Sequence, residues 1–320
     1  MADARTIRYR DEDSVYAGVA GEVIELESAN PVNHHQAITD PGGAEPVTID
    51  GKLFVPPGEG ERPAVMIVPG SLGVGPNHEA HAETLVEAGF VVFVVDPFGP
   101  RAVSSTVANQ TQYSFAASAW DVLAALRVLR DRPEVDAARI AAQGHSRGGA
   151  AVTIAACRRF ADPIVGPGVE LASAYAVYPW CGQQFVDADL GSTRYRAIIG
   201  ELDEWCSVQQ VQGQVHAFVA AGADASLRVV PGAHHSFDRL EQVSMIAEAS
   251  VAPSAPTTYL ADDGAVLDRD TGAPDPGATD RDVFVAAMKA GFGRTGAAIG
   301  GIDDQPETFR ADMLAFHASL

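Results

Sequence analysis

The pentapeptide Gly144-His145-Ser146-Arg147-Gly148 stands between a mostly apolar run typical of a strand, residues 139–143, and a run of small residues typical of a helix, from residue 149. A serine at such a strand-to-helix turn has a strained backbone, and its hydroxyl is raised above the edge of the sheet. Glycine two residues before and after the serine avoids a collision of a Cβ with the neighbouring strand and helix. The spacing therefore predicts a strand–turn–helix unit with Ser146 as a nucleophile.

Strand-like and helix-like runs alternate through the middle of the chain. Residues 64–68 and 90–95 are continuously apolar, which is typical of strands buried on both faces of a parallel sheet. Val122, Leu126 and Leu129 mark one face of a helix. The alternation predicts an α/β fold with a mostly parallel central sheet and helices on both faces. Further strands are expected at 140–143, 174–178, 195–199 and 227–230.

Three segments depart from this alternation. Residues 1–60 are expected to hold an N-terminal extension and two antiparallel strands, at 22–27 and 47–55, on one edge of the sheet. Residues 249–279 are rich in Pro, Gly, Ala and Asp, and they predict an irregular surface insertion. Residues 303–320 are expected to form a final helix that docks on the sheet. Because no internal repeat is visible, we expect the 320 residues to form a single domain.

Composition and charge limit the partners. The formal net charge is −20, from 42 acidic and 22 basic residues, and this field repels nucleic acid and anionic membrane surfaces. Residues 1–16 have no apolar stretch of the kind found in a signal peptide, and no apolar run approaches the ~20 residues of a membrane helix. The sparse cysteines, Cys157, Cys181 and Cys206, are typical of a reducing compartment. We expect a cytoplasmic protein that acts on a small molecule, with homo-oligomerisation left open.

A serine hydroxyl becomes a useful nucleophile only when an imidazole takes its proton and a carboxylate orients that imidazole. On sheets of this kind the three groups follow in the order serine, acid, histidine, each after a strand. Asp203 follows the strand expected at 195–199. His234 and His235 follow the strand expected at 227–230. Because adjacent residues of an extended loop point in opposite directions, only one of the two histidines can face Ser146.

Other side chains compete for these roles. Asp187 and Asp189 lie further from a strand end than Asp203, and Asp238 is too close in sequence to the histidines to reach behind the ring. His78 and His81 have a spacing close to that of metal ligands on a helix, but no third ligand accompanies them in the sequence. We therefore expect neither a metal nor another cofactor.

An oxyanion hole requires backbone N–H groups directed at the developing negative charge. One donor is expected from Arg147, the residue after the nucleophile. The second is expected from the glycine-dense loop after the first parallel strand, where Ser71 is the first choice and Leu72 the second.

Three motifs together resemble the dienelactone hydrolase family of the α/β-hydrolase superfamily: Gly-His-Ser-Arg-Gly-Gly at 144–149, Gly-Glu-Leu-Asp-Glu-Trp at 200–205 and Pro-Gly-Ala-His-His-Ser-Phe-Asp at 231–238. The stretch at 95–101 is similar as well. The resemblance implies that His235, rather than His234, is the base and that Asp203 is the acid. Dienelactone hydrolases proper use a cysteine nucleophile and have a glutamate where this chain has Gly70. We therefore expect a broader range of ester or lactone substrates than dienelactone.

The sequence thus predicts a serine hydrolase that cleaves carboxylic esters or lactones of small organic acids through an acyl-enzyme. An amidase or peptidase with the same triad, or an inactive binding protein on the same fold, is the alternative. Arg101 is a candidate for neutralising a substrate carboxylate. The residues expected to line the pocket are Leu72, Phe98, Arg101, His145, Tyr178, Trp180, Trp205 and Phe237.

Overall fold

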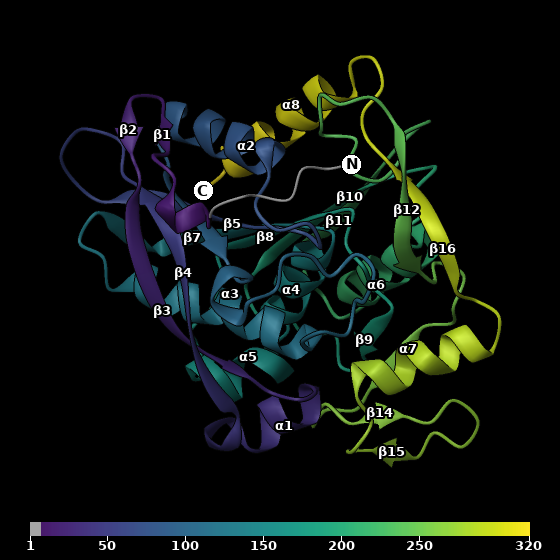
Figure 1. The fold of residues 1–320 in the computed structure, drawn as a ribbon. Coiled ribbons are helices and arrows are strands. Elements are labelled where there is room, and N and C mark those ends of the chain that lie inside the picture. The colour runs from purple at the N-terminus through teal and green to yellow at the C-terminus, as the bar shows by residue number, and fades with distance from the viewer. Residues whose placement is uncertain (1–7) are drawn as a thin grey trace.

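An eight-stranded sheet with the order β11-β10-β8-β7-β5-β6-β4-β3 forms the centre of the structure, a computed structural model that describes residues 8–320 (Figure 1). Residues 1–7, part of the predicted N-terminal extension, lie outside the described residues. The strands from β11 to β6 run parallel, whereas β4 is antiparallel to both of its neighbours, β6 and β3. The strands of this sheet are β3 (Glu22–Asn30), β4 (Glu45–Phe54), β5 (Arg62–Val68), β6 (Val91–Asp96), β7 (Val135–His145), β8 (Ser173–Val177), β10 (Arg194–Gly200) and β11 (Ala225–Val230).

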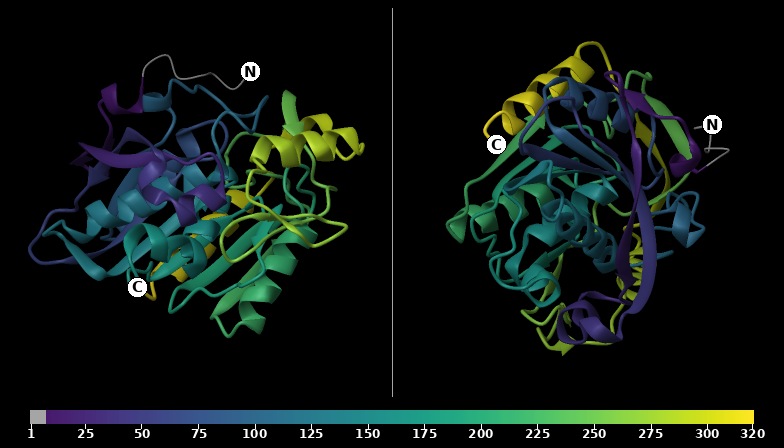
Figure 2. Two further views of the ribbon diagram at one scale, coloured as in Figure 1. Left: turned by 90° about the horizontal axis from the view of Figure 1, so that it is seen from below. Right: turned by 90° about the vertical axis from the view of Figure 1, so that its left-hand side faces the viewer.

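Helices cover both faces of the sheet (Figures 1 and 2). On one face the Tyr175 hydroxyl of β8 donates a hydrogen bond to Asp312 of α8 at 2.8 Å. On the other face Tyr195 of β10 is hydrogen-bonded to Thr153 of α4 at 2.9 Å. The helices are α2 (Pro76–Glu87) and α8 (Gln305–His317) on the first face, α3 (Phe115–Arg130), α4 (Arg147–Ala156) and α6 (Val208–Ala220) on the second, and α1 (His34–Thr39) and α5 (Arg158–Val165), which pack outside α3.

The predicted α/β architecture is confirmed. Every residue of β6 is buried, as its continuous apolarity predicts for a strand covered on both sides. One contiguous cluster of buried apolar side chains runs through the sheet and both helical layers. In the described part of the chain no helix is long and apolar enough to cross a bilayer. Two short strands near the N-terminus, β1 (Val15–Tyr16) and β2 (Val19–Ala20), form a separate antiparallel pair.

The prediction of an irregular insertion at 249–279 is wrong in part, because this segment contains paired strands. A four-stranded sheet joins β9 (Gln183–Phe185) to three strands of the segment, and β12 pairs with β16 further along the chain. Strands of two or three residues are too short to show a period of alternation, and β12 and β13 also pair with strands that are distant in sequence. The elements of this region are β12 (Ser244–Val251), β13 (Thr258–Leu260), β14 (Val266–Leu267), β15 (Pro274–Asp275), α7 (Asp280–Lys289) and β16 (Arg294–Ile299).

Candidate active site

Ser146 occupies the tight turn between β7 and α4. Its φ is +56° and its ψ is −112°, a strained conformation for a residue other than glycine. A Cβ added to Gly144 would lie 2.0 Å from the carbonyl oxygen of Gly148, and one added to Gly148 would lie 2.3 Å from that of Val68. The two glycines therefore allow the strand, the helix and the neighbouring β5 to approach closely enough to form the turn.

The structure brings Ser146, His235 and Asp203 together from three loops at the carboxyl edge of the sheet. His235 Nε2 lies 2.9 Å from Ser146 Oγ, and His235 Nδ1 lies 2.7 Å from Asp203 Oδ2. The other carboxylate oxygen of Asp203 accepts the backbone N–H groups of Trp205 and Cys206 at 2.8 and 2.9 Å. The imidazole is buried and the Asp203 side chain has no exposure to solvent. These contacts match the hydrogen-bond chain of a nucleophile, a base and an orienting acid.

Aromatic rings hold the His235 imidazole. Trp205 stacks on it, with ring centroids 5.3 Å apart and planes within 17°, and the Tyr178 ring lies tilted at 4.5 Å. These contacts restrict rotation of the imidazole, which must stay aligned with two hydrogen-bond partners. The sequence analysis proposed Trp205 and Tyr178 only as pocket walls, and it missed their contact with the histidine.

Strand β16 supports both loops that carry the acid and the base. The N–H of Gly300, just after β16, donates to the carbonyl of His235 at 2.9 Å. The Trp205 indole N–H donates to the carbonyl of Ala298 at 2.9 Å, and the Glu204 carboxylate accepts the N–H of Ala298 at 2.8 Å. The chain that returns from the 249–293 region therefore helps to position His235 and Trp205.

A small cavity of about 30 Å³ lies between the loop after β5 and His235. Gly70, Ser71 and Leu72 border it together with Ser146. A Cβ at position 70 would lie 3.1 Å from the Ser146 Cβ, so glycine there lets the loop approach the nucleophile closely. The volume is sufficient for about one water molecule or one oxygen atom of a substrate.

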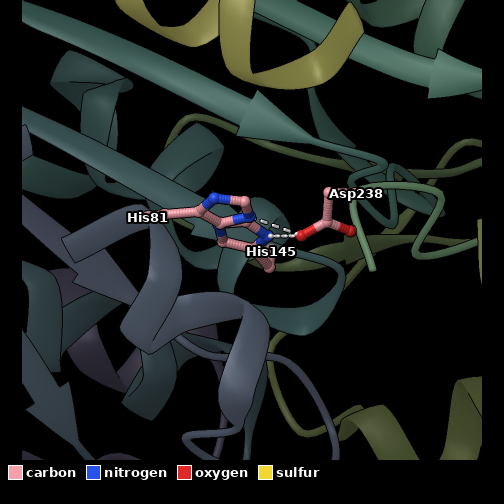
Figure 3. A group of neighbouring side chains, drawn as sticks. All are labelled: His81, His145 and Asp238. Atoms are coloured by element: carbon pink, nitrogen blue, oxygen red, sulfur yellow. Dashed lines mark hydrogen bonds and ion pairs between the residues drawn. The ribbon is translucent and has the colours of Figure 1, made fainter. Parts of the chain in front are cut away.

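A buried hydrogen-bond network lies behind the catalytic groups (Figure 3). Asp238 accepts His81 Nε2 at 2.7 Å, Asn77 Nδ2 at 2.8 Å and the Tyr178 hydroxyl at 2.8 Å. His145 Nδ1 lies 3.0 Å from that hydroxyl. Burial by itself would raise the pKa of Asp238, but the hydrogen bond from His81, the charge interactions with His145 and His81 and the hydrogen bond from Asn77 together hold this pKa well below its ordinary value. Asp238 therefore holds Tyr178 in place, and Tyr178 in turn packs on His235.

His81, His145 and Asp238 also have the spacing of a metal site, since their donor atoms lie within 4.8 Å of one another. Hydrogen bonds explain this proximity. The Tyr178 hydroxyl donates to Asp238, so its oxygen can accept from His145 Nδ1, while His145 Nε2 lies 3.1 Å from the Gln143 amide. The close contacts are therefore those of two imidazoles that hydrogen-bond to one carboxylate and to one hydroxyl. The sequence analysis missed this cluster because Asp238 lies far along the chain from the histidines.

Three buried histidines predict a loss of stability in acid. Burial lowers the pKa values of His145 and His317 to about 3, and that of His78 well below its ordinary value. Between pH 6.5 and 3 the unfolded chain therefore binds more protons than the folded one, so the free energy of unfolding falls as the pH falls. Each histidine contributes up to about 1.4 kcal/mol per pH unit.

The variant His317→Gln tests this expectation, because a glutamine amide can still donate to Gln143, the partner of His317 Nε2 at 3.0 Å. We measure the free energy of unfolding by urea titration from pH 7 to pH 4. We expect it to fall less steeply with pH in the variant than in the wild type, by up to about 1.4 kcal/mol per pH unit, because the variant lacks one titrating group. Parallel curves for the two proteins would contradict the assignment of His317 as a buried neutral histidine.

The predicted pocket residues divide into two groups. Leu72, His145 and Tyr178 border the small cavity, Trp180 borders a larger one described below, and Trp205 and Ser71 border both. Phe98, Arg101 and Phe237 border neither, contrary to the prediction. The two phenylalanines are buried in the interior, as aromatic side chains commonly are.

Arg101 is not free to bind a substrate carboxylate. Its guanidinium makes two hydrogen bonds to the buried carboxylate of Asp121, at 2.8 and 2.9 Å, and a third to Asn30 at 2.8 Å. Its role in the structure is to tie the loop after β6 to α3 and β3.

The fold, the site and a comparison with known proteins together identify the family of this chain. The fold and the arrangement of Ser146, His235 and Asp203 are those of an α/β-hydrolase. The sequence profile of the dienelactone hydrolase family matches residues 49–257, more than half of the chain, so the chain belongs to the dienelactone hydrolase family. Membership of this family identifies it as a hydrolase. No curated protein matches the chain.

Solved structures show the same fold at low identity. The dienelactone hydrolase-like promiscuous phosphotriesterase P91, from metagenomic libraries, is similar with a TM-score of 0.50 and 17% identity, over 84% of this chain and 96% of that one. The thermophilic esterase Est2 of the Planctomycetes species Thermogutta terrifontis, solved with propionate bound, has a TM-score of 0.50 and 16% identity, over 72% of this chain and 89% of that one.

Proposed function

We propose that this hydrolase cleaves carboxylic esters or lactones with Ser146 as its nucleophile. The observation that carries the proposal is the continuous hydrogen-bond chain from Ser146 through His235 to Asp203, with distances of 2.9 and 2.7 Å. Acyl transfer needs this arrangement because the serine proton must leave as the new bond to the carbonyl carbon forms.

Each residue then has a defined role. Ser146 Oγ attacks the carbonyl carbon while His235 Nε2 takes its proton, and Asp203 stabilises the resulting imidazolium. The backbone N–H groups of Arg147 and Ser71 hold the negative oxygen, with Leu72 as the alternative to Ser71. His235 next protonates the departing alcohol, and a water molecule releases the acid from Ser146.

The cysteines support serine as the nucleophile. Cys157, Cys181 and Cys206 are all free and buried. Burial raises the pKa of Cys157 to about 12 and that of Cys206 well above its ordinary value, so these thiols stay protonated at neutral pH. Three unpaired thiols also support the proposal that the protein works in a reducing compartment such as the cytoplasm.

Covalent labelling tests the proposal directly. A fluorophosphonate probe is expected to label the wild type and not the Ser146→Ala variant, and a panel of esters and lactones is expected to show turnover by the wild type. A folded wild type that is neither labelled nor active would favour a binding protein. Faster cleavage of matched amides than of esters would favour an amidase, and full activity of Ser146→Ala would refute the assignment of the nucleophile.

A further inference from the structure

A second, much larger cavity opens onto the nucleophile. Its volume is about 1130 Å³, and Ser146, Ser71 and Trp205 border it at the catalytic end. Pockets that bind drug-sized ligands have volumes of about 300–1,000 Å³. A substrate no larger than a short-chain ester would leave most of this cavity filled with water.

Part of the roof of the cavity comes from residues 249–279, which the sequence analysis treated as an irregular insertion, and the rest comes from the helix α7 that follows them. Residues of β13, β14, the β14–β15 connection and α7 border the cavity together with Trp180 and with Phe185 of β9, the strand that pairs with β13. In Figure 1 the short strands and α7 lie together at one end of the sheet, beside β9. From the roof, Leu267, Val283 and Phe284 contribute apolar side chains. All three are only partly buried by the protein itself, so a ligand there would remove further apolar surface from water.

The charges around the cavity oppose an anionic ligand. Three acidic residues, Asp268, Asp280 and Asp282, border it, against two basic ones, Arg147 and Arg269. The three carboxylates accept hydrogen bonds from the protein but remain sources of negative charge. The Arg147 guanidinium is already engaged, since it donates to the Ser118 hydroxyl and to the backbone carbonyls of residues 110, 113 and 114. Arg101, the other candidate for binding a carboxylate, lies outside the cavity and pairs with Asp121. The chain as a whole carries a net charge of −20.

We propose that the substrate is a neutral ester with a bulky apolar group, which lies in this cavity beneath the 252–292 roof. The inference rests on the proposed function of Ser146, and it replaces the earlier expectation of small organic acids by a more specific class. The acyl side of the scissile bond supplies the apolar group, and the cavity excludes water from it.

Two substrate series test the proposal. For p-nitrophenyl acetate, butyrate and octanoate we expect kcat/KM to rise at least ~10-fold from the first to the last, because each buried methylene adds apolar contact. The second series compares p-nitrophenyl methyl adipate, which is neutral, with mono-p-nitrophenyl adipate, which is anionic. We expect the neutral ester to be cleaved at least ~10-fold faster in kcat/KM, because the carboxylates oppose a like charge.

Variants in α7 test whether the preference for long acyl chains arises in this cavity. Val283→Trp places a large ring in the cavity and is expected to lower the octanoate-to-acetate ratio of kcat/KM at least ~10-fold. Val285→Trp is the matched control, since Val285 lies on the same helix, is 38% exposed and does not border the cavity. If Val283→Trp does not fold, as judged by its thermal melt, Leu267→Trp tests the part of the roof that β14 forms.

The outcomes separate the two proposals. A wild type that is labelled by fluorophosphonate and cleaves acetate, but shows no gain with chain length, overturns the inference and leaves the proposed function standing. Equal or faster cleavage of the anionic adipate overturns the claim of neutrality. A protein that is neither labelled nor active overturns the proposed function, and the inference falls with it.

Discussion

Replacing His235 by alanine is expected to lower kcat/KM for ester hydrolysis by at least ~10³-fold, because Ser146 then has no base to take its proton. His235 Nε2 lies 2.9 Å from the serine oxygen, and no other imidazole is hydrogen-bonded to it among the described residues. The rate should be measured by continuous assay on the best ester of the panel, with the thermal melt as a check on folding.

The neighbouring His234 is the matched control for this variant. It lies one residue away, is only half-buried and makes no hydrogen bond to Ser146 among the described residues. His234→Ala is expected to keep kcat/KM within about threefold of the wild type. A large loss in His234→Ala together with a small loss in His235→Ala would reverse the assignment of the base.

Asp203→Asn is expected to lower kcat by roughly 10³–10⁴-fold while leaving the fold intact. The asparagine oxygen can still accept the N–H groups of Trp205 and Cys206, as Asp203 Oδ1 does at 2.8 and 2.9 Å. Its amide would then donate to His235 Nδ1, so the imidazole proton would move to Nε2. In that tautomer Nε2 cannot accept the proton of Ser146, and catalysis fails although every distance is kept.

Asp187 and Asp189 provide the controls for Asp203, since each was a rival for the orienting acid. Asp187 instead accepts a hydrogen bond from the side chain of Arg159 at 2.6 Å. Asp187→Asn and Asp189→Asn are expected to leave kcat nearly unchanged in the same assay. A loss in either variant comparable to that of Asp203→Asn would show that the wrong carboxylate has been assigned.

The parts of the fold that sequence predicted well have local causes. Continuous apolarity at residues 91–95 predicts a strand covered on both faces, and the glycines around Ser146 predict the turn that the structure contains. The positions of Asp203 and of the two histidines after successive strands pointed to the acid and the base, and the resemblance to the dienelactone hydrolase family selected His235 over His234. The single-domain organisation stays a prediction, which the contiguous apolar core supports.

The parts that sequence missed depend on partners distant in the chain. β13 pairs with β9, about 75 residues earlier, so its three residues show no recognisable strand pattern by themselves. Arg101 was predicted to bind a substrate carboxylate because nothing in the sequence indicates that it pairs with Asp121, which lies in α3. The capping threonine Thr279 predicts a helix through Lys289, which is α7, but not that Val283 and Phe284 of this helix border a cavity.

The pairing of β12 with β16 has a consequence for engineering specificity. Residues 294–300 are hydrogen-bonded to the loops of Trp205 and His235. Replacing all of residues 244–300 by the corresponding segment of a related hydrolase would therefore remove backbone groups that position His235. Residues 252–293 connect the two paired strands and form most of the roof of the large cavity. A library or a grafted module confined to those limits could change which molecules enter, while the reacting groups keep their scaffold.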